Sequence, residues 1–154
     1  MNFLEQLVNE WFEYQGSFVL TNQKFGRLGH GGWQGEMDIA AFDPLTGSLT
    51  HVEVSIDADT WAKRRTRIGQ KFDSAEPFYS ELFPFAAPPI RQLAIIGTSP
   101  KPKTRLGLPK VEEMSIPEFV HQVTAGLADA HPLRAAVPEH LPSLRAMQFA
   151  LHWG

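Results

Sequence analysis

A tight turn between two short apolar segments constrains the fold of this chain more than any other feature. Residues 43–47 read Asp-Pro-Leu-Thr-Gly, a combination typical of a reverse turn because proline restricts φ and glycine tolerates a positive φ. The flanking segments 36–42 and 49–56 are rich in apolar side chains and have the length of β-strands. The sequence therefore predicts a β-hairpin over residues 36–56.

The rest of the chain shows the periodicities of both helices and strands. Helical spacing of apolar side chains occurs in four segments, which are 3–14, 60–82, 116–129 and 141–153. Further strands are expected at 17–25, 92–97 and 111–114. The glycine-rich segment 26–35 predicts a loop without regular structure. This succession predicts an α/β fold with a central mixed β-sheet flanked by helices, in the order αβββαββα.

Length, charge and hydropathy narrow the class of protein. The 154 residues suffice for one domain, for which we expect a core over about 3–115 and a C-terminal helical extension over about 116–154. The absence of cysteine excludes disulfides, thiol nucleophiles and thiolate metal sites. A net charge of −3 means that a nucleic-acid partner would need a local basic patch. Without a signal peptide or an apolar run near the ~20 residues that span a bilayer, we expect a cytoplasmic protein with no membrane partner.

Two acidic residues, Asp38 and Glu53, interrupt the apolar strands of the predicted hairpin. A buried carboxylate costs several kcal/mol unless it is paired or binds a metal. Two facing carboxylates also repel each other, and a hard divalent cation such as Mg²⁺ (or Mn²⁺) would neutralise both. If this face of the hairpin is solvated instead, the two are ordinary surface acids. Strand alternation places Asp38 with Glu36 and Ala40, opposite Met37 and Ile39, and places Glu53 with His51 and Ser55.

The segments Gly35-Glu36-Met37-Asp38-Ile39 and Val52-Glu53-Val54-Ser55, in this order after an acid-bearing helix, resemble the PD-(D/E)XK nuclease superfamily. The resemblance covers roughly residues 3–97 and implies a restriction-endonuclease-like fold and a Mg²⁺-dependent phosphodiesterase, a nuclease that acts on DNA. It implies that Asp38, Glu53 and the main-chain carbonyl of Val54 bind the metal. It also implies that Glu5, at the rim of the apolar stripe of the first helix, binds a second metal or a coordinated water.

The sequence departs from the superfamily at Ser55, which stands where the strand lysine is expected. Some members of the superfamily carry this lysine on the following helix. In a helical projection of residues 60–82, Lys71 lies beside the apolar stripe that faces the sheet, whereas Lys63 points away. Lys71 is therefore the candidate catalytic cation, which would orient the attacking water and offset charge at phosphorus. The alternative is that Lys71 only extends along the edge of the core.

Two basic clusters could contact phosphates, and two other functions remain open for this chain. The candidate phosphate contacts are Arg64, Arg65, Arg67, Lys101 and Lys103; such clusters also occur on solvated faces. The Ser55 substitution and the negative net charge favour an alternative, a catalytically inactive nuclease-fold module that binds DNA or protein. A third alternative makes the hairpin acids structural and the apolar face of the last helix, residues 141–151, a partner or homodimer surface.

Overall fold

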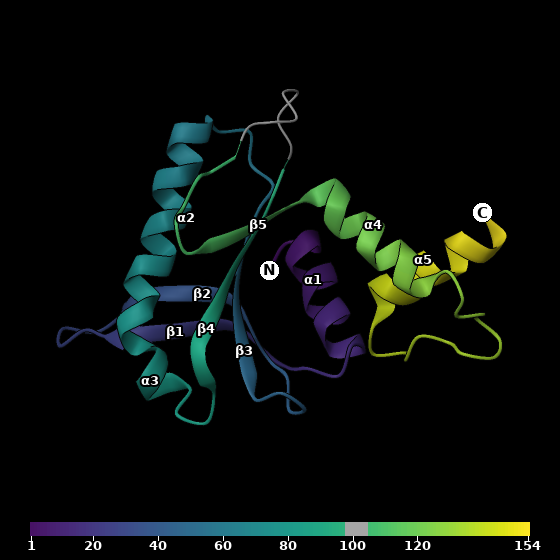
Figure 1. The fold of residues 1–154 in the computed structure, drawn as a ribbon, viewed down its shortest axis with the longest axis horizontal. Coiled ribbons are helices and arrows are strands. Elements are labelled where there is room, and N and C mark those ends of the chain that lie inside the picture. Colours follow the sequence, from purple (N-terminus) through teal and green to yellow (C-terminus); the bar gives the residue numbers. More distant parts are fainter. Residues whose placement is uncertain (98–104) are drawn as a thin grey trace.

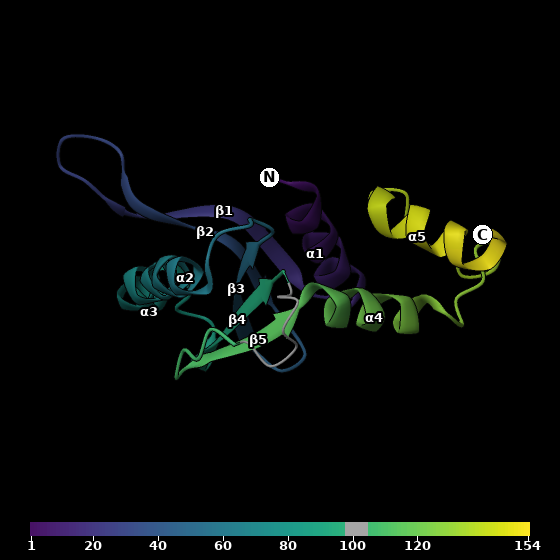
Figure 2. The same ribbon diagram turned by 90° about the horizontal axis from the view of Figure 1, so that it is seen from above.

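The computed structural model describes residues 1–97 and 105–154, which form one mixed β-sheet with helices on both faces (Figures 1 and 2). Its five strands lie side by side in chain order. They are β1 (Phe18–Arg27), β2 (Trp33–Phe42), β3 (Ser48–Ser55), β4 (Ala87–Ile96) and β5 (Val111–Ser115). Strands β1, β2 and β3 are antiparallel neighbours, whereas β3, β4 and β5 run parallel. The α/β class and the central mixed sheet predicted from the sequence are therefore confirmed.

The helices are distributed over the two faces of the sheet (Figure 2). On one face lie α1 (Phe3–Tyr14) and α4 (Ile116–Leu127), with α5 (Pro142–Trp153) packed against them. On the other face lie α2 (Trp61–Ala75) and the short helix α3 (Tyr79–Leu82). Each face buries its own apolar clusters, so two layers of helices hold the sheet between them.

The ends of these elements follow from local chemistry. The predicted β2–β3 hairpin is confirmed, and Gly47 adopts a φ of 74° in its turn. Helix α1 begins with a capping box, in which the Asn2 side chain accepts from amides of the first turn and the Glu5 carboxylate accepts from the Asn2 amide. Helix α2 ends at Ala75, and Pro77 lies in the 3₁₀ turn Glu76–Phe78 that leads into α3. This interruption is expected, because proline has no N–H to continue the helical hydrogen bonds.

The glycine-rich segment corrects one prediction. Half of the expected loop over 26–35 is strand, because β1 continues to Arg27 and β2 begins at Trp33, so that residues 28–32 remain between them. The ladder pairs Phe25 with Gly35 and Arg27 with Trp33. A side-chain carbon at Gly35 would collide with the Phe25 ring. This glycine thus allows close packing within a strand and does not signal a flexible loop.

The C-terminal segment shares the main core with the rest of the chain. Leu141 and Leu144 are buried in the same cluster as α1 and the sheet, while Phe149 and Leu151 are 62% and 44% exposed. The described chain ends with two helices, α4 and α5, where the order αβββαββα counts one. Among residues 1–97 and 105–154, no helix combines the length and apolar character needed to cross a bilayer.

Candidate functional site

Strand β2 is irregular at Asp38, and this irregularity brings two acids together. The β2–β3 ladder ends at the pair Ile39–Val52, one step before Asp38 would face Glu53, and β1 has no ladder partner at Asp38. In the opening between β2 and β3, the Val54 amide donates to Asp38 Oδ2 at 3.0 Å. The Asp38 amide donates to Glu53 Oε1 at 3.4 Å. The two carboxylates therefore converge at the point where the strands separate.

The same irregularity corrects the predicted alternation of β2. Met37 lies in the buried cluster of Phe25 and Ala40, on the side of α2 and α3, whereas Ile39 packs towards α1. Strict alternation had placed Met37 with Ile39. Because the pairing is interrupted at Asp38, the residues before it are rotated relative to those after it.

Lys71 of α2 joins the two acids. Its ammonium nitrogen lies 2.8 Å from Asp38 Oδ1 and forms an ion pair with Glu53 Oε2. Buried Ile68 and Phe72 hold this helix against the sheet, so the edge of its apolar stripe carries Lys71 over the carboxylates. The side chains of Asp38 and Lys71 are 14% and 34% exposed, whereas Glu53 is 1% exposed. Solvent thus reaches the group from the side of Lys71.

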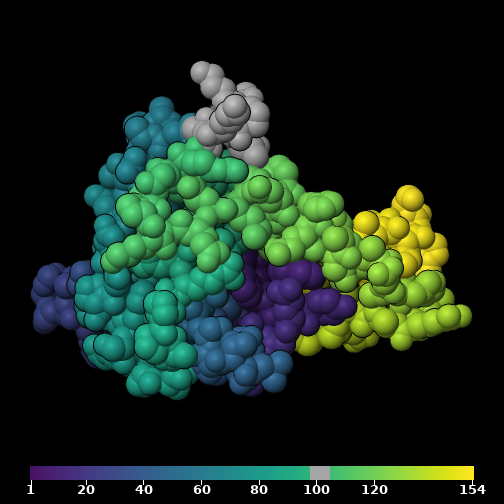
Figure 3. Space-filling view, in the orientation of Figure 1, coloured from purple at the N-terminus to yellow at the C-terminus, as the bar shows by residue number. Residues whose placement is uncertain are grey.

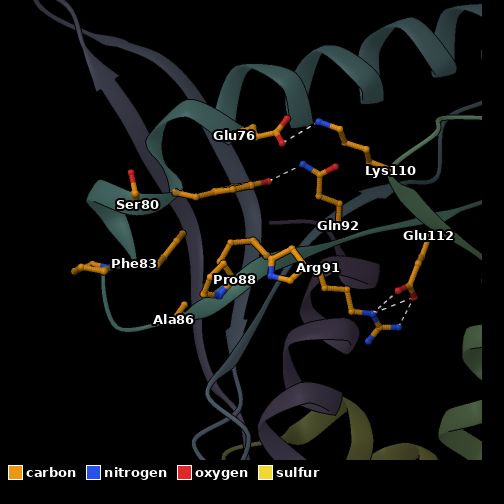
Figure 4. A pocket seen from close by; sticks show the side chains of 13 residues that line it. Glu76, Ser80, Phe83, Ala86, Pro88, Arg91, Gln92, Lys110 and Glu112 are labelled. Atoms are coloured by element: carbon orange, nitrogen blue, oxygen red, sulfur yellow. Dashed lines mark hydrogen bonds and ion pairs between the residues drawn. The ribbon is translucent and has the colours of Figure 1, made fainter.

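A buried hydrogen-bond chain supports Glu53 from behind. His51 Nε2 lies 2.7 Å from Glu53 Oε1, and His51 Nδ1 lies 2.6 Å from the Tyr79 hydroxyl. Gln92 Nε2 donates to the same hydroxyl at 3.1 Å (Figure 4). Since the Gln92 amide nitrogen can only donate, the hydroxyl gives its proton to Nδ1, and Nε2–H donates to Glu53. The chain therefore directs a proton of a neutral His51 towards Glu53.

The sequence predicts only part of this hydrogen-bond chain. Alternation correctly places His51 on the face of Glu53, but Tyr79 and Gln92 were not predicted as site residues. Tyr79 belongs to the apolar stripe of the helical segment, and Gln92 is the β4 ladder partner of His51. A strand–strand register, which a single sequence does not supply, would have been needed to find Gln92.

Burial and charge set the protonation of the group. Burial, with repulsion from Asp38, raises the pKa of Glu53 well above its ordinary value, against the opposing effect of Lys71. Burial, with the charge of Lys71, lowers the pKa of His51 to about 3, so this ring is neutral. Burial alone would raise the pKa of Asp38, but hydrogen bonds and the Lys71 charge hold it below its usual value. The carboxylates likewise raise the pKa of Lys71 despite its burial.

The donor set suits a hard cation in part. Carboxylate oxygens are ligands that Mg²⁺ prefers, and Mg²⁺ keeps several waters when few protein ligands are present. Glu53 Oε2 is buried and receives no well-directed hydrogen bond within the described residues, so it has acceptor capacity left. The described residues contain no group of three or more His, Cys, Asp or Glu side chains arranged around one cation. The Lys71 ammonium contacts both carboxylates. It therefore occupies the position that a cation bridging the two carboxylates would take.

A cleft of about 350 Å³ opens onto this group. It lies between the β1–β2 hairpin and α2, and Asp38 and Lys71 contribute to its wall. The other lining residues are Phe25, Gln34, Gly35, Glu36, Arg67, Gln70 and Ser74. A larger cavity of about 880 Å³ lies between α3 and strands β4 and β5 (Figure 4) and reaches Tyr79 and Gln92, but neither Asp38 nor Glu53 lines it. Access to the carboxylates is therefore through the smaller cleft.

The structure does not bring Glu5 to this group. Its carboxylate accepts from the Asn2 side chain at 2.6 Å and from the Asn2 amide at 3.2 Å. Within the described residues, Glu5 has no hydrogen bond or ion pair with Asp38, Glu53 or Lys71. In this structure Glu5 caps its own helix, and its expected role at a second metal or a coordinated water stays a prediction.

The predicted phosphate contacts differ in their availability. Arg64 is only 7% exposed, it stacks over Trp61, and it donates to Asp57, so it is not free to bind phosphate. Arg67 borders the cleft and forms ion pairs with Asp57 and Asp59. Arg65 is exposed, and Lys101 and Lys103 lie outside the described residues. Ser55, at the position of the strand lysine, donates to Asp57 Oδ2 at 2.5 Å.

No family model matches this sequence, and no curated protein does. A solved structure is similar, namely the crystal structure of AF1548, a protein of unknown function, with a TM-score of 0.56 and 15% sequence identity. The match covers 95% of this chain and 78% of that chain. At this identity the similarity concerns the fold alone, so it supports the α/β architecture and assigns no activity.

Proposed function

We propose that this protein is a metal-dependent phosphodiesterase of the restriction-endonuclease-like type, which hydrolyses DNA. The observation that supports the proposal most is the convergence of Asp38, Glu53 and Lys71 at the opening between β2 and β3. Two carboxylates and one cation from three different elements meet here; Asp38 and Lys71 line a solvent-accessible cleft, and Glu53 is buried in contact with Lys71. Such a group is costly to bury, and a catalytic role would explain its presence.

In this mechanism Asp38 and Glu53, with the Val54 carbonyl, would hold Mg²⁺ or Mn²⁺. Such a cation, when bound, lowers the pKa of a water ligand and stabilises charge on the phosphate. His51 keeps Glu53 Oε1 occupied by a hydrogen bond, whereas the buried Oε2, beside Lys71, retains acceptor capacity. Lys71, released from one carboxylate, would orient the attacking water and offset the charge that develops on phosphorus. The water oxygen bonds to phosphorus and one P–O ester bond breaks, leaving a phosphate monoester and an alcohol.

Cleavage of labelled DNA in the presence of Mg²⁺ tests this proposal. Asp38→Asn and Glu53→Gln are expected to lower the rate at least 100-fold, because each removes a metal ligand. Glu139→Gln is the matched control, since Glu139 is 90% exposed and lies outside the site. Equal cleavage by the wild type and both site variants would rule out this active site.

A second function is favoured by one specific observation. The strand position of the catalytic lysine holds Ser55, and Lys71 already forms ion pairs with both carboxylates. This arrangement also suits a catalytically inactive module that retains the fold for binding DNA or protein. Calorimetric titration with Mn²⁺ separates the two functions: binding that is lost in Asp38→Asn supports the enzyme, and no heat of binding in the wild type supports the module.

A further inference from the structure

The β1–β2 hairpin extends beyond the two layers of helices as a projecting arm (Figures 1, 2 and 3). Its tip, residues 28–32, contains three of the glycines, and Gly31 and Gly32 have φ values of 97° and 85°. Next to the tip, Arg27 and Trp33 are ladder partners and therefore lie on the same face of the arm. Trp33 is 46% exposed, so a large aromatic surface beside Arg27 is accessible to a ligand.

The base of this arm is firmly packed. Phe25 is 3% exposed, its ring lies over Gly35, and it packs against Phe78 with ring centroids 5.3 Å apart. A side-chain carbon at Gly26 would lie 2.6 Å from Gln34 Cβ, so this position is closely packed as well. The arm therefore holds its exposed residues at a fixed place relative to α2 and the cleft.

The arm also forms one wall of the cleft that leads to Asp38. Phe25, Gln34 and Gly35 line it from the arm, and Arg67 and Lys71 line it from α2. Its volume of about 350 Å³ is near the lower end of the range of sites for small organic molecules. A site of this size accepts about one nucleotide at a time, whereas a duplex would have to separate before a strand entered it.

The charge of the molecule favours the same type of ligand. Duplex binding relies on many phosphate contacts by lysine and arginine, but the net charge is −3 and both cations of the cleft wall are already in ion pairs. Proteins that bind single strands also contact phosphates, but they gain additional affinity by stacking unpaired bases on exposed aromatic rings. Trp33, with Arg27 beside it, supplies such a ring and one cation.

We infer that the β1–β2 arm binds single-stranded DNA, with one base stacked on Trp33 and a neighbouring phosphate paired with Arg27, and directs the strand into the cleft at Asp38. The delivery of the strand for cleavage rests on the proposed function; the binding does not. The ligand is thus an unpaired strand or a single-stranded end, and the arm determines this preference.

Fluorescence anisotropy of a short labelled oligothymidylate, measured in EDTA, tests the inference without any cleavage. Trp33→Ala is expected to weaken binding about tenfold, while Trp33→Phe retains most of the affinity because stacking needs only an aromatic ring. Arg27→Gln is expected to make the affinity for the oligomer less dependent on salt, by about the contribution of one phosphate contact. Trp153→Ala is the control: this residue is 51% exposed on α5, at the opposite end of the molecule from the arm (Figure 3).

The outcomes separate this inference from the proposed function. Three outcomes would each overturn the inference that the arm binds single-stranded DNA. They are no binding of the oligomer by the wild type, wild-type affinity in Trp33→Ala, and equal losses of affinity in Trp33→Ala and Trp153→Ala. Equal losses in Trp33→Ala and Trp33→Phe would replace stacking by a structural role. A DNA duplex and an RNA oligomer of the same length are measured beside the oligothymidylate, and stronger binding of either would overturn the choice of ligand. If the arm variants behave as expected but the wild type does not cleave DNA, the arm stands and the phosphodiesterase fails.

Discussion

Replacing Glu53 by glutamine tests whether the candidate site is held together at a cost to stability. The Glu53 carboxylate is 1% exposed and its pKa is raised by burial and by repulsion from Asp38. Glutamine has nearly the same shape, and its amide oxygen can still accept the hydrogen bond from His51 Nε2. The change removes the buried charge and leaves Lys71 paired with Asp38. We therefore expect Glu53→Gln to be more stable than the wild type at neutral pH.

The size of the expected stabilisation by Glu53→Gln follows from the free-energy contributions that the substitution changes. Transfer of a carboxylate out of water costs several kcal/mol even after relaxation. The ion pair with the partly exposed Lys71 offsets part of this cost. The difference leaves about 1–3 kcal/mol in favour of the variant, which corresponds to a rise in Tm of roughly 2–10 °C for a domain of this size.

The pH dependence has a defined sign. Because the pKa of Glu53 is raised by folding, the folded protein keeps a proton that the unfolded chain releases near pH 4.5. The stability linked to this group is complete below that pH and is lost as the pH rises through the raised value. The advantage of Glu53→Gln should therefore grow as the pH rises above 4.5. Asp38 has a lowered pKa, so its contribution is lost in both proteins as the pH falls below about 3.8.

Thermal unfolding followed by circular dichroism over a pH series that starts near 4.5 and extends above neutrality measures this effect. Glu112→Gln is the control, because Glu112 also lies on a strand and pairs with Arg91 but is 56% exposed; its loss should change stability by about 1 kcal/mol or less. A Tm for Glu53→Gln at or below that of the wild type across this range would refute the reasoning.

Three further predictions concern Lys71, Tyr79 and Glu5. In Lys71→Met the two carboxylates lose their counter-charge, so Mn²⁺ should raise Tm more in the variant than in the wild type; no rise in either protein would contradict a cation position there. Tyr79→Phe leaves His51 Nδ1 and the Gln92 amide without their partner, and chemical denaturation should show a loss of about 1–3 kcal/mol. Glu5→Ala removes half of the capping box of α1 and should lower stability by about 1 kcal/mol in the same assay; unchanged stability with lost DNA cleavage would return Glu5 to the active site.

Much of the candidate site follows from local sequence patterns. The turn at 43–47 aligns β2 with β3, and the strand period places His51 and Glu53 on one face. The helical period places Lys71 at the edge of the apolar stripe of α2, so that packing this stripe on the sheet carries the ammonium to the carboxylates. These features depend on periodicity within single elements, which a sequence displays directly.

Other features depend on which elements become neighbours. The interruption of β2 pairing at Asp38, which moves Met37 to the other face, arises only when three strands are assembled. The role of Gly35 depends on the Phe25 ring across the ladder. The Glu5 contact is the opposite case, because a capping contact closes locally without any tertiary partner.

The sequence by itself therefore determined the α/β class, the hairpin that carries the acids, and the side of α2 from which a lysine could reach them. Only the tertiary structure decided which hydrogen-bond partners the buried polar groups find. Gln92 reaches the Tyr79 hydroxyl from another strand, and Glu10 of α1 accepts from the Leu144 amide of α5, 134 residues along the chain. A buried polar group must find a partner somewhere in the fold, and which partner it finds is a property of the packed elements and not of the residues adjacent to it in sequence.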